Sequence, residues 1–413
     1  MNKEFFVLNR DKVAKKLRNN SIAVFFGGQA PYKSADEVYK FTPNRNFYYL
    51  TGIDEPKVIM MMIKNDNKVT EHIFIQESDP IMEKWVGRTI SPDEAEDISG
   101  VTDIKYLKEF NDTVGSYLNM FNIENLYLDL ERQEINIAST EAQEFAKIIV
   151  QKYPYIKIKN IYDEIALLRT IKSKEEVDLI KKAIEITNTG ILSMFKNAKP
   201  GMMEYEIEAY FDFELKKNGV KDFAFPTIAA AGINGTILHY ESNDSMTKEG
   251  DLLLLDLGAQ YKYYNADISR TFPVNGKFTE RQKQIYNIVL KANEEVMKAV
   301  RPGITTLDLQ NLTKSVLAEG CKAIGLIKEY SELEKYYYHG VAHPLGLDTH
   351  DVGPRGVELK PGMIITDEPG LYIEEEGIGI RIEDDILVTE EGYVNLSENI
   401  IKSVEDIEAY MNN

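Results

Sequence analysis

The chain has 413 residues, of which 43% are hydrophobic and 28% charged, a composition typical of a folded globular protein with two or three domains. Acidic residues outnumber basic ones by 67 to 48, and the resulting net charge of −19 argues against a nucleic-acid partner. No segment approaches the roughly 18 consecutive apolar residues of a membrane span, and the start lacks the apolar core of a signal peptide. We therefore expect a cytoplasmic protein, and its single cysteine excludes an internal disulfide framework and a cysteine-based metal cluster.

As far as about Asp163, apolar runs alternate with helix-like segments, which predicts a mixed α/β domain. The predicted strands are Ile22–Phe26, Val58–Ile63, Ile73–Ile75, Leu126–Leu130 and Ile156–Ile158. A helix is predicted over 139–150. Residues 41–56, FTPNRNFYYLTGIDEP, are rich in aromatics and are interpreted as a core strand with a loop. The only tryptophan, Trp85, marks either a contact surface or a half-buried packing position.

A second domain begins after a break at 165–173. Ser173 and Glu176 form a predicted capping box, and apolar residues then recur at helical spacing. This helix ends at 198–201, AKPG, and another is predicted over 204–217. The predicted domains are residues 1–165 and 166–413.

The second domain contains a weak internal repeat. Residues 280–303 form another amphipathic helix with a Pro-Gly stop, and a further helix follows over 307–320. The Gly-x5-Asp segment 250–256 is matched by the Gly-x5-Glu segment 362–368, and both are apolar in between. Each half thus consists of helix, helix and hairpin. We predict an α+β domain whose pseudo-two-fold duplication sets two hairpins face to face.

Each predicted hairpin carries two carboxylates. The apolar run 252–257 predicts a strand buried on both faces, and a turn near 261–262 would bring Asp267 directly across from Asp256, with Cβ atoms about 5 Å apart. In the second hairpin, Glu383 would return opposite Glu368.

A protein core cannot hold four such charges without compensation, so the pattern indicates bound cations. Oxygen-rich ligation suits divalent ions such as Mn²⁺, and one imidazole would also admit Zn²⁺, Co²⁺ or Fe²⁺.

Histidine is rare, with five residues in the chain, and four of them lie beside the duplicated hairpins. These four are His239, His339, His343 and His350. Three of them fall within twelve residues, which favours a functional role over ordinary core or surface positions. Arg381 shares a strand face with Glu383, where it would either neutralise a carboxylate or bind a substrate carboxylate or carbonyl.

Five segments in order carry a family resemblance: LLLLDLG, NADISRTFPVNG, HGVAHPLGLDTHDVG, TDEPGLYI and GIGIRIEDD. Together they resemble the Xaa-Pro aminopeptidase (aminopeptidase P) and prolidase family of pita-bread metallopeptidases. The N-terminal part is similar to the amino-terminal domain of that family through SADEVYKFTPNRNFYYLTGIDEP and EKWVGRTISP. The resemblance covers nearly the whole chain and implies an α/β N-terminal domain followed by a pita-bread catalytic domain.

The resemblance implies a dinuclear metal site, usually of Mn²⁺. Its five ligands would be Asp256, Asp267, His343, Glu368 and Glu383. Asp256 would hold one ion, and His343 and Glu368 the other. Asp267 and Glu383 would bridge the two.

The resemblance also implies a mechanism in which a metal-bridging hydroxide attacks the scissile carbonyl. Glu368 would take the proton of the water and deliver it to the leaving nitrogen. His350 and His239 would stabilise the oxyanion or position the substrate. His339 and Arg381 complete the expected substrate-binding residues.

The implied activity is that of an aminopeptidase acting on peptides with proline at the second position. A prolidase restricted to Xaa-Pro dipeptides would share the same ligands, and a metal-free binding protein on the same fold is a third alternative. Related enzymes are dimers or tetramers, so we expect a homo-oligomer. Two positions depart from the family pattern, Pro344 after His343 and Asp367 before Glu368, and both bear on specificity and metal preference.

Overall fold

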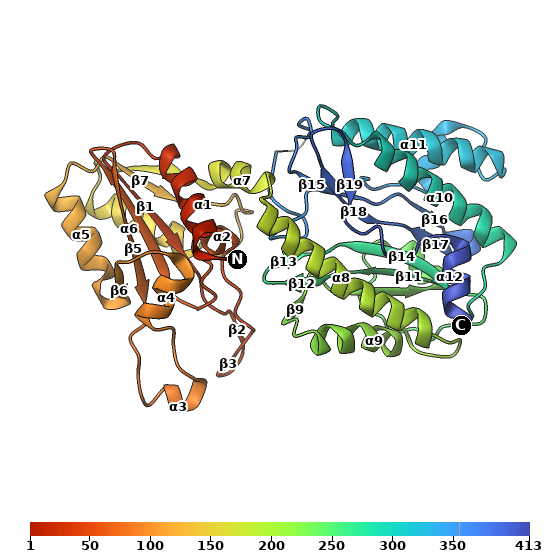
Figure 1. Ribbon diagram of the computed structural model, residues 1–413, viewed down its shortest axis with the longest axis horizontal. Coiled ribbons are helices and arrows are strands. Elements are labelled where there is room, and N and C mark those ends of the chain that lie inside the picture. The colour runs from red at the N-terminus through yellow and green to blue at the C-terminus, as the bar shows by residue number, and fades with distance from the viewer. Residues whose placement is uncertain (355) are drawn as a thin grey trace. The chain divides into compact units, whose positions relative to one another are not determined.

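The computed structural model describes residues 1–354 and 356–413. The chain divides into two compact units, Met1–Leu168 and Arg169–Asn413 (Figure 1). In the described part of the chain, no helix combines the length and the apolar content that crossing a bilayer requires.

The N-terminal unit is built on a mixed six-stranded sheet, because β1 pairs antiparallel with β4 and parallel with β7. In spatial order the strands are β6 (Ile104–Tyr106), β5 (Lys68–Ile75), β4 (Ile59–Asn65), β1 (Ser21–Phe26), β7 (Asn125–Leu128) and β8 (Lys157–Asn160). All five predicted strands are present, with small shifts at their ends. A short hairpin, β2 (Tyr32–Ser34) and β3 (Glu37–Val38), projects from the unit (Figure 1).

Helices pack on both sides of this sheet (Figure 1). The helices of this unit are α1 (Lys3–Lys16), α2 (Arg45–Thr51), α3 (Glu83–Val86), α4 (Pro92–Ser99), α5 (Phe110–Met120), α6 (Glu141–Lys152) and α7 (Tyr162–Thr170), with a 3₁₀ turn η1 (Leu107–Glu109). Of these, α3 lies away from the sheet, at the end of a projecting segment (Figure 1). Phe110 of α5 and Phe145 of α6 meet Phe26 of β1 with ring centroids 6.3 and 5.7 Å away. These edge-on aromatic contacts join the sheet to the helices.

Residues 41–56 contain a helix rather than the expected core strand. Asn44 caps α2 by accepting a hydrogen bond from the backbone N–H of Phe47 at 2.9 Å, and Gly52 ends it at a left-handed φ of 69°. Residues 46–51 are all buried. Because the helix is buried all round, it lacks the amphipathic period that identifies a helix, and its aromatics mimic a strand.

The expected break at 165–173 is mostly helical, since α7 reaches Thr170 and α8 (Lys174–Asn197) starts soon after it. The boundary between the two units, Leu168 to Arg169, does fall within this segment, but no Gly or Pro there interrupts the helix. Ser173 caps α8 as predicted, with Oγ accepting the N–H of Glu176 at 3.3 Å and the Glu176 carboxylate accepting the N–H of Ser173 at 2.8 Å. α9 (Glu204–Lys217) has the predicted bounds.

The second unit repeats the order helix, helix, sheet, which confirms the predicted duplication (Figure 1). The first set is α8, α9 and the sheet of β10 (Ile228–Ala231), β11 (Leu252–Leu257) and β14 (Ile268–Pro273). The second set is α10 (Glu280–Ala299), α11 (Thr306–Ala323) and the sheet of β15 (Ile364–Asp367), β18 (Asp384–Val388) and β19 (Tyr393–Asn395).

Smaller elements complete the second unit. They are β9 (Asp222–Phe223), η2 (Gly232–Thr236), β12 (Ala259–Tyr261), β13 (Tyr264–Asn265), η3 (Tyr330–Lys335), β16 (Gly370–Ile373), η4 (Glu374–Glu376), β17 (Ile378–Arg381) and α12 (Val404–Met411).

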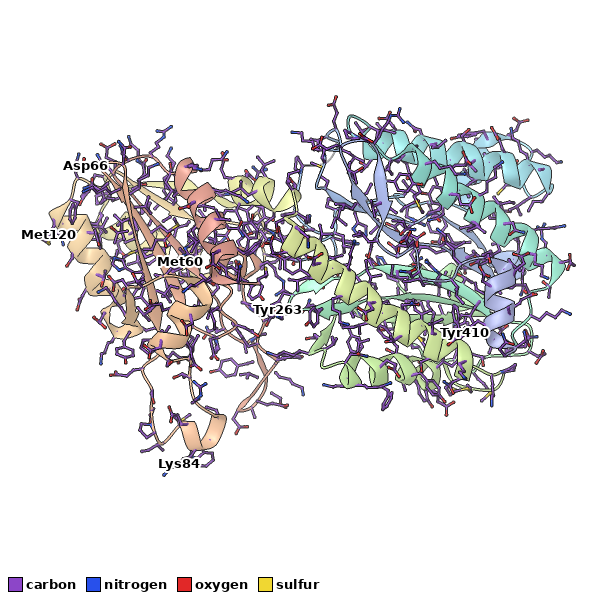
Figure 2. The ribbon with its side chains drawn as sticks, in the orientation of Figure 1. Met60, Asp66, Lys84, Met120, Tyr263 and Tyr410 are labelled. Carbon is purple, nitrogen blue, oxygen red and sulfur yellow. The ribbon has the colours of Figure 1, made fainter. Side chains whose placement is uncertain are left out.

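The first hairpin turns one residue later than expected. Its turn is Lys262–Tyr263, with both residues at positive φ (49° and 67°), and Figure 2 labels Tyr263 there. Asp256 consequently pairs with Ser269 instead of Asp267. Such turns normally carry Asn or Gly, so the Lys-Tyr pair gave no signal of its position. Asp256 and Asp267 nevertheless share one face as diagonal neighbours.

The second hairpin has the expected register. Asp367 pairs with Asp384, and the ladder of β16 and β17 continues with the same register beyond it. Glu368 and Glu383 lie between these two ladders and are therefore opposite each other.

Candidate metal centre

The two hairpins meet through hydrogen bonds. The backbone N–H of Glu383 donates to the carbonyl of Ser269 at 3.0 Å, and the hydroxyl of Ser269 donates to Glu383 Oε2 at 2.8 Å. The backbone N–H of Asp267 donates to Asp385 Oδ2 at 3.2 Å. These contacts bring acidic side chains from both halves of the second unit to one place.

Three predicted ligands form a compact group. Asp267, His343 and Glu383 each offer one ligand atom, and the three atoms lie within 4.8 Å of one another. Glu368 adjoins them, because its Oε1 is 3.7 Å from Nε2 of His343, which is itself 3.4 Å from Oδ2 of Asp267. Asp267 and Glu383 are buried, whereas Glu368 is partly exposed. The group is thus close enough for several side chains to share one ion.

The imidazole of His343 is oriented for ligation through Nε2. Its Nδ1 lies 3.0 Å from the carbonyl oxygen of Pro344, and a carbonyl can only accept, so Nδ1 carries the proton there. The backbone is fixed by Thr366, whose Oγ1 accepts the N–H of His343 at 3.1 Å and whose N–H donates to its carbonyl at 3.0 Å. Fixing the proton on Nδ1 leaves the Nε2 lone pair for a cation.

Asp256, the fifth predicted ligand, is held by Arg381. Its Oδ2 accepts a hydrogen bond from Nη2 of Arg381 at 2.6 Å. Its Oδ1 is buried and receives no hydrogen bond from the residues that the structure describes. A buried carboxylate oxygen without a donor is unfavourable unless a cation faces it.

The pKa values in the group reflect crowded, buried charge. Burial is the main reason that the pKa of Asp267 rises to about 6 and that of Glu368 to about 7, and the charge of Asp256 adds to both increases. Burial also raises the pKa of Glu383 well above its usual range, with further repulsion from Asp267. Burial lowers the pKa of His343, but the hydrogen bond and charge of Asp267 outweigh it and bring the value to about 9.

These features fit divalent cations. Four carboxylates and one imidazole form a hard, oxygen-rich donor set with a single nitrogen, and the unpartnered Oδ1 of Asp256 points to a positive charge on its side of the group. Without ions the group must retain protons, as its raised carboxylate pKa values indicate.

The other predicted site residues surround this group differently. The Nε2 of His339 is 2.8 Å from the hydroxyl of Tyr372, and its Nδ1 is 3.7 Å from Glu368. The ring of His350 packs edge-on against His343 with centroids 4.3 Å apart. His239 is exposed. Burial lowers the pKa of His339 to about 4, followed by the charges of Arg381 and His239. Burial also lowers the pKa of His350, followed by the charges of His343 and His239.

Arg381 is buried, and its guanidinium makes three hydrogen bonds. Besides Asp256, it donates from Nε to Ser269 Oγ at 2.8 Å and from Nη1 to the hydroxyl of Tyr372 at 3.0 Å. In this arrangement Arg381 neutralises a neighbouring carboxylate, which was one of its two expected roles.

Several residues of the site were missed by sequence reasoning. They are Ser269, Thr366, Tyr372 and Asp385. Each acts through a partner distant in the sequence, so no local pattern marks it. Only Ser269 could have been found, because side chains two residues apart on a strand lie on the same face, and Ser269 is two residues beyond Asp267.

The two departures from the family pattern lie beside the group. Pro344 supplies the carbonyl that fixes His343, and that carbonyl would be present with any residue at this position. Asp367 is buried on the other strand face, where Asn293 of α10 donates to its Oδ2 at 3.3 Å. Its pKa is raised well above the usual range by burial and by Asp384, so it adds little negative charge behind the site.

Comparisons with known proteins match this architecture. The model of metallopeptidase family M24 matches residues 178–390, and that of the aminopeptidase P N-terminal domain matches residues 6–127. The Xaa-Pro aminopeptidase of Escherichia coli K12 is 34% identical, over 100% of this chain and 98% of its own.

Two solved structures are similar over the full length. A Bacillus anthracis protein provisionally assigned as an aminopeptidase P has 56% identity and a TM-score of 0.99, covering 100% of this chain and 99% of that one. Aminopeptidase P of E. coli with the inhibitor Pro-Leu has 33% identity and a TM-score of 0.93, covering 100% of this chain and 98% of that one. The likeness therefore extends over both units.

Proposed function

Because this chain belongs to metallopeptidase family M24 and carries an N-terminal domain of the aminopeptidase P type, we propose that it is an Xaa-Pro aminopeptidase, which releases the first residue from peptides with proline second. The observation that carries the proposal is the compact group of Asp267, His343 and Glu383, whose ligand atoms lie within 4.8 Å of one another. We assign residues 1–165 to the N-terminal domain and 166–413 to the catalytic domain.

The proposed cofactor is a pair of divalent ions, most simply Mn²⁺, because oxygen donors dominate the group. The side chains that would hold them are Asp256, Asp267, His343, Glu368 and Glu383. Asp267 and Glu383 are assigned as the bridging residues, since each hairpin contributes one of them to the compact group with His343. Bound there, the ions would supply a water of lowered pKa and a Lewis acid for the scissile carbonyl.

Glu368 is the proposed proton carrier. Its partial exposure gives it access to a substrate, and its Oε1 lies 3.7 Å from Nε2 of His343, beside the proposed metal ions. The nitrogen of an Xaa-Pro bond carries no hydrogen, so the leaving proline must receive one when the bond breaks. We assign this delivery to Glu368.

The other three histidines of the site are assigned to substrate, and Arg381 is assigned to the support of Asp256. His239 and His350 would donate hydrogen bonds to the oxyanion or to the peptide backbone. His339 is oriented by Tyr372, with its ring beside Glu368. Arg381 would act mainly by holding Asp256 in place, because its three hydrogen bonds already occupy it.

The test uses purified protein loaded with Mn²⁺ and three peptides: an Xaa-Pro tripeptide, the matched Xaa-Ala tripeptide and the Xaa-Pro dipeptide. We expect release of the first residue from the Xaa-Pro tripeptide and much slower turnover of the Xaa-Ala peptide. Cleavage of the dipeptide alone would favour a prolidase. Failure to bind any metal would instead leave a binding protein on the same fold.

We also propose a homo-oligomer, dimer or tetramer, formed through two projections of the N-terminal unit. Figure 2 labels Lys84 on α3 at the end of one projection, and the other is the β2–β3 hairpin. Together they expose Tyr32, Val38, Tyr39, Ile81, Met82, Trp85 and Val86. Trp85 is 81% exposed, which favours a contact surface over half-buried packing.

Sedimentation tests this assembly directly. We expect a dimer or tetramer, and Trp85→Ser should shift it toward smaller species because an exposed aromatic anchor is lost. A monomeric native protein would contradict the proposal.

A further inference from the structure

The imidazole of His239 is exposed and is not held by a hydrogen bond from any described residue. Its neighbours Leu238 and Tyr240 are partly buried and pack against an apolar cluster that includes Ile228 and Tyr372. His239 is not part of that cluster, so its position depends on how the backbone on either side of it is held.

A single buried carboxylate anchors this backbone. Glu204, the first residue of α9, has 0% exposure and accepts four hydrogen bonds. Its Oε1 accepts the N–H of Ala231 at 2.7 Å and the side-chain amide of Asn234 at 3.0 Å. Its Oε2 accepts the hydroxyl of Tyr240 and the N–H of Ser245, both at 2.8 Å. All four donors belong to residues 231–245, on both sides of His239.

The next turn of α9 holds the end of the same segment. Asn243 has a left-handed φ of 46°, and its side-chain amide donates to Glu208 at 2.9 Å and to the carbonyl of Thr227 at 2.8 Å. Its Oδ1 accepts the N–H of Ala229 at 3.0 Å. Because residues 204 and 208 are four apart, both carboxylates face the segment from one side of the helix.

The other side of the segment is closed by close backbone packing. The carbonyl oxygen of Gly235 in η2 would be only 1.8 Å from a Cβ at Gly379 of β17. β17 ends at Arg381, which holds Asp256. The segment is thus fixed between α9 and the strand that leads to the metal centre.

We propose that Glu204 is a positioning residue for the reaction, acting through Tyr240 to place the imidazole of His239 against bound substrate. The inference rests on the substrate role assigned to His239 above. A fully buried carboxylate with four donors is a rigid anchor, whereas an exposed ring on an unsupported loop would sample many positions. Tyr240 directly follows His239 in the chain, so a shift of Tyr240 moves the backbone that carries the imidazole.

The experiment is a double-mutant cycle between Tyr240→Phe and His239→Ala in the Mn²⁺-loaded protein. Tyr240→Phe keeps the ring and its packing but removes the hydroxyl that donates to Glu204 and lies 3.1 Å from Asp244. We expect it to lower kcat/KM for an Xaa-Pro tripeptide about tenfold, with Mn²⁺ affinity and Tm close to those of the native protein.

If Tyr240 acts by positioning His239, Tyr240→Phe should no longer lower kcat/KM when His239 has already been replaced by alanine. If Tyr240→Phe lowers activity by the same factor whether or not His239 is present, the inference is overturned. If His239→Ala alone leaves kcat/KM unchanged, the substrate role of His239 fails, and the positioning inference fails with it. The His239→Ala variant alone tests the substrate role of His239, and the comparison of Tyr240→Phe with and without His239 tests the positioning.

Two further variants complete the design. Glu204→Gln keeps the size of the side chain, but its NH₂ cannot accept, so two of the four donors lose their partner and kcat/KM should fall further than in Tyr240→Phe. If Glu204→Gln fails to fold, the double-mutant cycle of Tyr240 and His239 still tests the inference.

Tyr117→Phe is the matched control, because it also removes one hydroxyl, which lies 3.1 Å from His72 in the N-terminal unit. It should leave activity unchanged, and a similar loss there would show that the effect is not specific.

Discussion

The two carboxylate oxygens of Asp256 differ in their partners, and Arg381 binds only one of them. Its Oδ2 accepts a hydrogen bond from Nη2 of Arg381 at 2.6 Å, while its buried Oδ1 receives no hydrogen bond from the described residues. Arg381 reaches Ser269 and Tyr372 at the same time.

Replacement of Arg381 by lysine should therefore be damaging although charge is kept. An ammonium cannot reproduce three hydrogen bonds from a planar guanidinium, so Asp256 loses its orientation and two buried hydroxyls lose a donor. We expect kcat/KM to fall about 100-fold with a smaller change in Tm. Steady-state kinetics beside thermal unfolding would check this, and near-native activity of Arg381→Lys would show that charge alone suffices.

The assigned ligands should separate from the assigned substrate residues in metal content. Asp267→Asn and Glu383→Gln should lose bound metal and activity together, because each removes a bridging carboxylate. His350→Ala should keep its metal and lose turnover. Elemental analysis of the purified variants measures occupancy directly, and loss of metal in His350→Ala would mean that the ligand set is misassigned.

Metal binding should tighten as the pH rises from about 5 to about 8. Asp267 and Glu368 have pKa values raised to about 6 and about 7, and that of His343 is raised to about 9, so the metal-free group holds protons at low pH. An incoming ion must displace them, which weakens binding below these values. Calorimetry in two buffers with different ionisation enthalpies would count the protons released. Affinity that does not change with pH would contradict the raised values.

Gly379→Ala should be strongly destabilising. The added methyl would lie 1.8 Å from the carbonyl oxygen of Gly235, and the three nearest atoms all belong to the backbone of Gly235 and Thr236, so no side chain can move aside. We expect a loss of about 3 kcal/mol or more in the free energy of unfolding. Gly392→Ala is the control, since nothing lies within 4 Å of its Cβ position and its φ is not positive. Equal Tm values for the two variants would contradict this packing.

The sequence predicted those features that depend on neighbours along the chain. Apolar runs predicted the strands of the first sheet except β6, and the capping pair Ser173 and Glu176 predicted the start of α8. Repeated glycine-to-acid spacing indicated the two hairpins. α2 was missed because it is buried all round. The first hairpin was misplaced by one residue because Lys262–Tyr263 carries no turn signal.

The site itself was accessible from sequence only in part. Its acidic and histidine residues could be recognised by type and spacing, but their supports could not. Ser269 touches Glu383 and Glu204 anchors Tyr240 across long stretches of chain, so these contacts appear only when the fold is known. Polar residues with distant partners look like ordinary surface residues in a sequence.

The contact between Ser269 and Glu383 can form only late in the synthesis of the chain. Its two partners are separated by 114 positions, and the acidic group exists only when both are present. A ribosome-bound chain from which residue 383 has not yet emerged would lack Glu383, one of the side chains assigned to the metal ions, and with it the contact that joins the two hairpins. The nascent enzyme would therefore remain inert toward the proline-containing peptides around it until its last strands have been made.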